Sequence, residues 1–150
     1  MAAESKRLPA GFREAIRFRQ KGASDEYDAA LTGESGTTFQ VRLRRSRVNQ
    51  LDFSVILAVC PPGSNAVFRL RRYNGKSHEH TNRIERRRFL DFHIHQATER
   101  YQRLGQKEDG YAEPTDRYAE LWGAWDCLLA DCAFETDEGP QGRLFTEGSQ

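Results

Sequence analysis

The chain has 150 residues, of which 37% are hydrophobic and 30% charged, and its formal net charge is +1. That length suits one domain with a buried core. No apolar run approaches the roughly 20 residues that span a bilayer, the N-terminus lacks the apolar stretch of a secretory signal, and the three cysteines form no Cys-x-x-Cys motif. These features argue against a membrane-spanning helix and a disulfide framework, and they predict a cytoplasmic protein with free thiols.

The N-terminal part of the chain carries one helical pattern. Residues 9–21 are predicted to form a helix, because apolar residues recur at helical spacing, a proline stands in the first turn and a glycine follows the last. Residues 22–36 are rich in Gly, Ser, Asp and Glu, which is typical of a loop. We therefore expect residues 1–36 to be an N-terminal helix and loop.

The middle of the chain alternates as β-strands do. In Thr38–Arg45 apolar residues occupy every second position, and Leu51–Val59 is apolar almost throughout, as in a central strand. Ala66–Tyr73 alternates again, and the pair Asn74-Gly75 after it is a strong turn signal. These segments predict an antiparallel sheet.

The C-terminal part predicts a second helix. Thr115 or Asp116 can cap a helix that runs to about Ala133 and carries both tryptophans on its apolar stripe. The expected fold class is α+β, a four- to five-stranded antiparallel sheet with N- and C-terminal helices packed on one face. We expect a single α+β domain over residues 37–134, followed by a flexible tail over residues 135–150.

All four histidines fall within eighteen residues, as two His-x-His pairs, His78 with His80 and His93 with His95. Residues two apart in a strand point to the same side. Imidazole titrates near neutrality and serves in proton transfer, metal ligation and anion binding. The pairs therefore mark the candidate site. The alternative interpretation is a solvated sheet face that happens to carry polar residues.

The second histidine pair lies in the alternating segment Phe89–Gln96. One side of this segment carries the apolar residues Leu90, Phe92 and Ile94, which are expected to face the core. Asp91 shares the other side with the two histidines and could orient or charge-stabilise an imidazole. The residues expected to carry catalysis are His78, His80, Asp91, His93 and His95.

The low net charge hides a strong segregation along the chain. Residues 39–107 carry fifteen Lys/Arg and five Asp/Glu, whereas residues 108–150 carry two and eleven. A basic middle favours a phosphate-bearing partner such as RNA, although the two parts could equally neutralise each other across the fold. The residues expected to hold phosphate beside the histidines are Arg69, Arg71, Tyr73 and Lys76.

Three functions remain open at this point. The favoured one is a small RNA-cleaving or RNA-binding protein, because two imidazoles with nearby cations suffice for acid–base cleavage without a metal or cofactor. The first alternative is a non-catalytic interaction module for nucleic acid or an acidic protein. The second is a metal-binding protein, because His78, His80 and Glu85 form a plausible ligand set. Nearby Lys and Arg residues disfavour a bound metal ion.

The segment from Val67 to His80 resembles small bacterial toxin-antitoxin proteins of the TumE type. It contains Arg-Tyr-Asn, then Gly-Lys, then His-x-His, after a similar meander of strands. Nothing separates Asn74 from Gly75 here, whereas that family spaces its motif more widely. The resemblance implies a bacterial cytosolic toxin that acts on RNA as an endoribonuclease and has a cognate antitoxin as its partner.

Overall fold

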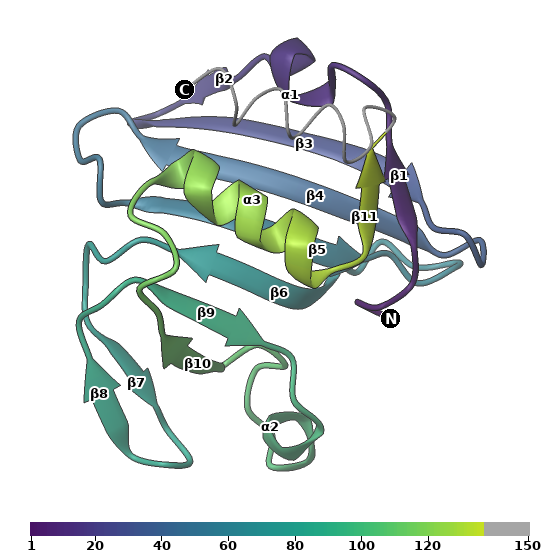
Figure 1. Ribbon diagram of the computed structural model, residues 1–150. Coiled ribbons are helices and arrows are strands. Elements are labelled where there is room, and N and C mark those ends of the chain that lie inside the picture. Colours follow the sequence, from purple (N-terminus) through teal and green to yellow (C-terminus); the bar gives the residue numbers. More distant parts are fainter. Residues whose placement is uncertain (137–150) are drawn as a thin grey trace.

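The computed structural model describes residues 1–136, which fold into a mostly β structure (Figure 1). Its main element is a seven-stranded antiparallel sheet with the strand order β10-β9-β6-β5-β4-β3-β2. The strands of this sheet are β2 (Arg19–Lys21), β3 (Ser24–Thr32), β4 (Thr38–Ser46), β5 (Phe53–Val59), β6 (Phe68–Asn74), β9 (His93–Gln96) and β10 (Tyr111–Pro114). The other strands are a parallel pair, β1 (Lys6–Leu8) with β11 (Phe134–Thr136), and a hairpin, β7 (His80–Asn82) with β8 (Arg87–Phe89).

Three short helices complete the described chain: α1 (Phe12–Ala15), α2 (Glu99–Arg103) and α3 (Leu121–Asp131). Of these, α3 packs against β5 and β6 and covers one face of the sheet (Figure 1). The predicted α+β fold, with four or five strands beneath two covering helices, is therefore wrong. Within residues 1–136, none of the helices has the length and apolar content needed to cross a membrane. Residues 135 and 136 of the predicted tail belong to β11, and the rest of that tail, residues 137–150, lies outside the described residues.

Residues 19–32, predicted as helix end and loop, form β2 and β3 instead. The polar strand β3 is stabilised by its neighbour β4. Asp25 stands opposite Arg45 and Asp28 opposite Arg42, and both pairs form ion pairs at 3.7 Å. Opposite charges facing each other across strands stabilise a sheet, whereas Ser, Asp and Ala are poor strand formers by themselves. Pairing with the strongly alternating β4 therefore decides the conformation of this segment.

The predicted N-terminal helix is confined to the single turn of α1. Ile16 is already extended and is buried in the core. The ring of Phe12 stacks on Trp125 with centroids 5.9 Å apart, and Phe18 packs edge-on against Trp122 at 6.3 Å. Extended chain after one helical turn brings these apolar side chains against the core and α3. Tertiary packing therefore overrides the helical spacing of the sequence.

The hydrophobic core lies between α3 and one face of the sheet. Its fully buried strand residues include Phe39, Val41, Leu43, Val55 and Leu57. The prediction of a central strand is confirmed, because β5 is the fourth of the seven strands and most of its residues are buried. Trp125 of α3 is 2% exposed and packs into this core from the helix side.

α3 begins at Leu121, later than the predicted cap at Thr115 or Asp116, because Glu120 caps it. The Glu120 carboxylate accepts hydrogen bonds from two backbone N–H groups of the first turn, at 2.8 and 2.6 Å. The preceding loop carries Tyr118 into the core. Its hydroxyl lies 2.8 Å from the carbonyl oxygen of Asn74 and 2.9 Å from that of His93. This contact ties the loop before α3 to β6 and β9.

Lys6 joins the two ends of the described chain through the β1–β11 pair. Its side chain is almost completely buried, and its amine donates hydrogen bonds to the carbonyl oxygens of Ala2, Glu4 and Cys132 at 2.6–2.7 Å. The ammonium group also lies 4.5 Å from the ring centroid of Phe39. A buried cation is tolerated when its donors are all satisfied. Lys6 therefore fastens β1 to the end of α3.

The pairing of β5 with β6 shifts register between Leu57 and Ala58. Such a bulge adds one residue to a strand and reverses which side the following residues face. Tyr73, predicted on the side of the histidines, is consequently buried in the core, and its hydroxyl donates to Asp131 of α3 at 2.7 Å. Arg72 takes the place opposite His95 instead.

Candidate metal centre

Strand β9 supplies two buried histidines. His93 and His95 are 2% and 3% exposed. Ile94 between them belongs to the core, so the alternation of a strand places both imidazoles on the sheet face away from α3. β9 is held on both sides, by β6 and by β10. The predicted orientation toward the core is confirmed for Ile94 and, in part, for Phe92, but it is wrong for Leu90, which is 57% exposed.

The hairpin of β7 and β8 supplies the third histidine and covers the first two. The ring of His80 has its centroid 5.2 Å from that of His93 and 4.7 Å from that of His95. Phe89, which stands opposite His80 in the hairpin, packs its ring edge-on against His93 at 5.6 Å. The hairpin therefore shields the imidazoles of β9 from water.

Asn82 fastens this hairpin to the free edge of β10. Its amide donates to the carbonyl of Ala112 at 2.7 Å, and its Oδ1 accepts from the Ala112 N–H at 2.9 Å. These two bonds occupy the same backbone groups that a neighbouring strand would use, so they also protect the edge. Asn82 is 1% exposed.

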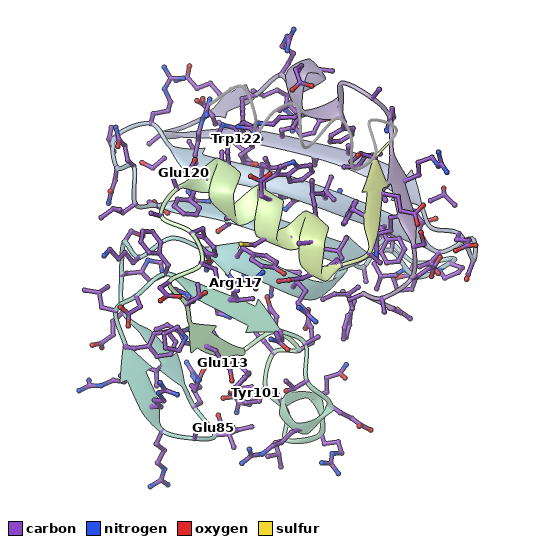
Figure 2. All side chains as sticks on the ribbon, viewed as in Figure 1. Glu85, Tyr101, Glu113, Arg117, Glu120 and Trp122 are labelled. Atoms are coloured by element: carbon purple, nitrogen blue, oxygen red, sulfur yellow. The ribbon has the colours of Figure 1, made fainter. Side chains whose placement is uncertain are left out.

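A second polar clamp holds the turn of the hairpin. Glu85 accepts hydrogen bonds from the hydroxyl of Tyr101 at 2.7 Å and from Arg100 at 2.9 Å. Figure 2 shows the Glu85 and Tyr101 side chains in the same part of the molecule, between the hairpin and α2. Glu85 is thus bound to α2. The predicted metal-ligand set, which needed Glu85 beside the histidines, is therefore wrong.

One ring nitrogen from each of His80, His93 and His95 lies within 4.8 Å of the other two. Within residues 1–136 this is the one cluster of three or more His, Cys, Asp or Glu with such spacing. Zinc–imidazole bonds are about 2.0–2.1 Å long. Small rotations of the rings would therefore bring all three nitrogens to ligand distance around a single ion.

The tautomers of His93 and His95 are determined by backbone carbonyls. Nδ1 of His93 lies 2.7 Å from the carbonyl oxygen of Asp91, and Nδ1 of His95 lies 2.8 Å from that of Asp109. A carbonyl oxygen can only accept, so each Nδ1 carries the hydrogen. Nε2 of each ring keeps its lone pair. A metal-ligating histidine typically donates its other N–H in this way.

The tautomer of His80 follows from Asn82. Because the Asn82 Oδ1 already accepts from the Ala112 N–H, the amide orientation is determined. Nε2 of His80 lies 2.8 Å from that oxygen and must therefore donate to it. The lone pair of His80 is left on Nδ1. His93 and His95 thus each have one anchored nitrogen and one nitrogen available as a ligand, whereas the His80 ring has a backbone hydrogen bond with Gly110 in addition to the one with Asn82.

Burial keeps all three imidazoles neutral. Burial is the main cause and the positive charge of Arg72 a smaller one, and together with the other nearby groups they lower the pKa of His93 to about 4 and that of His95 to about 2. Burial also lowers the pKa of His80, and the hydrogen bond to Asn82 opposes this shift only in part. Neutral imidazole is the form that binds metals, whereas a general acid at neutral pH needs a pKa near 7.

A buried carboxylate offsets the positive charge beside the cluster. Asp109 is completely buried and forms ion pairs at 3.2 Å with both Arg69 and Arg72. Glu108 adds a second negative charge, 3.8 Å from the Nε of Arg69. Two cations are therefore balanced by two anions, so these arginines add little net charge at the cluster.

Three of the cations that disfavoured a metal ion in the sequence lie elsewhere or are partly neutralised, whereas Arg87 lies on the hairpin face that carries His80. Arg88 forms an ion pair with Glu79 at 3.8 Å, and the ammonium of Lys76 lies 5.0 Å from the ring centroid of Phe92. Arg86 occupies the hairpin turn with a φ of 57°. The electrostatic objection to a divalent ion is thereby weakened.

The other residues predicted for catalysis are not part of the cluster. His78 is exposed, and its ring bonds the neighbouring hydroxyl of Ser77 at 3.1 Å. Asp91 orients His93 through its backbone carbonyl, while its carboxylate is exposed. The predicted role of the Asp91 carboxylate is therefore not seen; the backbone carbonyl that orients His93 could come from any residue at position 91.

The predicted phosphate-binding residues are scattered. Tyr73 is buried against α3, and Arg71 stands opposite Leu57 on the core side of β6. Arg69 is engaged with Asp109, and Lys76 lies in the turn after β6. None of these four side chains contacts the three imidazoles.

Three contributors were missed from the sequence. Asn82 could have been found, because it lies two positions after His80 and so shares its side of a strand. Arg72 could not be placed at the site, because the bulge in β6 that brings it opposite His95 leaves no sequence signal. Asp109, far along the chain in the loop before β10, is brought to the site only by the fold.

No protein-family model matches this chain, and no curated protein or solved structure matches it either. The resemblance to TumE-type proteins therefore stays a prediction, and the geometry of the cluster carries the functional argument.

Proposed function

We propose that the protein binds one divalent transition-metal ion, with zinc as the best candidate, through Nδ1 of His80 and Nε2 of His93 and His95. The observation that carries this proposal is the convergence of three neutral imidazoles, each with its second nitrogen anchored to an oxygen. Imidazole is a preferred ligand of zinc, copper, iron and nickel. Anchored tautomers hold the ligand lone pairs in place before the ion arrives.

Three protein ligands favour a catalytic ion over a structural one. Structural zinc sites are closed by four protein ligands, whereas catalytic sites keep one position for water or substrate. Zinc lowers the pKa of bound water to about 7 and so supplies hydroxide at neutral pH. We therefore assign the protein to metal-dependent hydrolytic chemistry, with the three histidines as metal ligands.

Metal-independent cleavage of RNA by the histidines is the competing hypothesis. It requires one imidazole that is protonated at neutral pH to act as the general acid. The lowered pKa values of His80, His93 and His95 weigh against that role. RNA itself remains a proposed partner, since its phosphates could be attacked by metal-bound hydroxide as well as by an acid–base pair.

The test is metal analysis of purified protein together with a titration of the metal-free protein with Co²⁺, which reports its coordination by visible absorption. We expect one ion per chain and loss of the tetrahedral absorption bands in His93→Ala and His95→Ala. Circular dichroism would establish that both variants remain folded.

His78→Ala is the matched control, because His78 is the histidine that lies outside the cluster. We expect it to bind Co²⁺ as the unaltered protein does. Absence of stoichiometric binding in the unaltered protein would refute the proposal. RNA cleavage that persists in chelator would then favour acid–base catalysis.

A further inference from the structure

Two arginines flank the histidine cluster: Arg72 of β6 stands opposite His95, and Arg87 of β8 lies on the hairpin face that also carries His80. We propose that they form an anion-binding position beside the metal ion, and that this position takes the phosphoryl group of a phosphate ester. This inference rests on the proposed metal centre, because the anion would occupy the coordination position that the three histidines leave open.

Arg87 lies on the inner face of the hairpin. It stands directly opposite Asn82, and residues opposite each other in an antiparallel pair share a face. That face also carries His80 and Phe89, which contact the cluster. The guanidinium of Arg87 lies 5.8 Å from the ring centroid of Phe89, and its side chain is exposed. Arg87 is thus a cation at the solvent-facing rim of the cluster.

Arg72 approaches the cluster from the sheet itself. It stands opposite His95, and its Nη2 lies 3.5 Å from Nδ1 of that ring. That contact is not a hydrogen bond to a lone pair, because the same Nδ1 donates to the Asp109 carbonyl at 2.8 Å. The Nε of Arg72 is buried beside the Asp109 carboxylate at 3.2 Å, so it is closed to an anion from solvent. The Arg72 side chain is 24% exposed, and its terminal Nη groups are the donors that an incoming anion would meet.

Phosphate fits this arrangement better than a carboxylate does. Asp109 and Glu108 together balance Arg69 and Arg72, which leaves the charge of Arg87 and the two charges of the ion. A phosphate monoester carries about −1.5 to −2 at pH 7 and three strong acceptor oxygens. Arginine forks match phosphate geometry, and one phosphoryl oxygen would remain for the metal ion. A carboxylate offers one negative charge and two oxygens.

The neighbouring residue Arg88 provides a matched control. It follows Arg87 in the same strand, so its side chain points to the opposite face of the hairpin. It stands opposite Thr81 and pairs with Glu79 at 3.8 Å. Substituting Arg87 or Arg88 makes the same change in net charge, but only Arg87 lies on the face of the metal ligands.

The experiment uses the full chain loaded with Co²⁺ and follows the visible absorption while inorganic phosphate is added. We expect a saturable spectral change. Its dissociation constant should rise about tenfold in Arg87→Ala, and the change should be absent in Arg87→Glu. Arg88→Ala and Arg88→Glu should bind phosphate within about twofold of the unaltered protein. Acetate at the same concentration should bind more weakly than phosphate.

A protein that takes up Co²⁺ but shows no phosphate-dependent change would overturn this inference and leave the metal centre intact. Equal losses in the Arg87 and Arg88 variants would also overturn it, because they would indicate general surface charge. Absence of Co²⁺ binding would instead refute the proposed function. A second arm with a short RNA lacking terminal phosphates separates the sources. If this RNA displaces inorganic phosphate, and Arg87→Ala weakens that displacement, the site binds the nucleic-acid backbone. If the RNA does not displace phosphate while phosphate still binds, the site takes a small phosphate ester.

Discussion

Two parts of this molecule are held together by different forces. The sheet part, with β1 to β6, α1, α3 and β11, is built on a continuous apolar core in which strand residues pack against Trp125. The site part, residues 75–114, contributes little to that core and is held by polar contacts. Its clamps are Asn82 on Ala112, Glu85 with Tyr101, and the ring nitrogens on backbone carbonyls. Apolar contacts each contribute a small part of the packing free energy. A buried polar group that loses its hydrogen-bond partner, by contrast, costs the full free energy of its desolvation.

This contrast predicts that the two parts fail differently. Loss of a core side chain should lower the stability of the whole chain. Loss of a polar clamp should open the site part and reduce metal binding while the sheet persists, because local opening costs less than global unfolding.

The largest effect is expected from Trp125→Ala, which empties the centre of the core. Phe→Ala and Trp→Ala changes at buried positions typically cost about 3–5 kcal/mol, and Trp125 is 2% exposed. Urea denaturation followed by circular dichroism measures the loss. Trp122→Ala on the same helix is the control, and its cost should be smaller because Trp122 is only partly buried. Equal losses would show that the core is not centred on Trp125.

Asn82→Ala should come next and should act mainly on the site. It removes the donor and acceptor that hold Ala112 and the acceptor that orients His80. Loss of an outer partner of a metal ligand typically costs 10–100-fold in metal affinity. Co²⁺ titration and hydrogen exchange over residues 76–92 measure the two effects. Asn65→Ala, at an exposed position, is the control. Unchanged exchange in the hairpin would contradict the role of Asn82 as its clamp.

Tyr118→Phe tests the connection between the two parts. The hydroxyl of Tyr118 bridges the carbonyl oxygens of Asn74 and His93, and its removal leaves buried acceptors without a donor. We expect a cost of about 1–2 kcal/mol in unfolding free energy and a fall in Co²⁺ affinity through displacement of His93. Tyr111→Phe, which removes an exposed bond to Glu113, should change neither. A stability loss without any change in Co²⁺ affinity would separate the two parts.

The smallest effect concerns acid stability of the sheet part. Burial raises the pKa of Asp131, but hydrogen bonds from Arg117 and Tyr73 outweigh it, so the pKa lies below the ordinary value of 3.8. The stabilisation is therefore complete above that pH and is lost as the pH falls through the lower, folded-state pKa. Partly exposed ion pairs contribute less than about 1 kcal/mol. Denaturation at pH 2–5 should show a shallower pH dependence in Asp131→Asn; an identical slope would rule out the contribution.

Alternation and spacing in the sequence determined much of the sheet and the approximate place of the site. The strands around Val41 and Val55 were predictable, because their apolar residues recur with a period of two and have one face to bury. The direction of Ile94 into the core, and hence of His93 and His95 away from it, follows from the same rule.

Only the tertiary structure decided what those histidines face. β2 and β3 become strands through pairing with β4, and the bulge in β6 exchanges Tyr73 for Arg72 at the site. The hairpin brings His80 onto His93 and His95, and a distant loop supplies the carboxylate of Asp109. Local spacing determines which side of a strand a residue takes, because side-chain direction is a property of the backbone. Contacts between segments depend on register, bulges and chain reversal, which the periodicity of one segment does not encode.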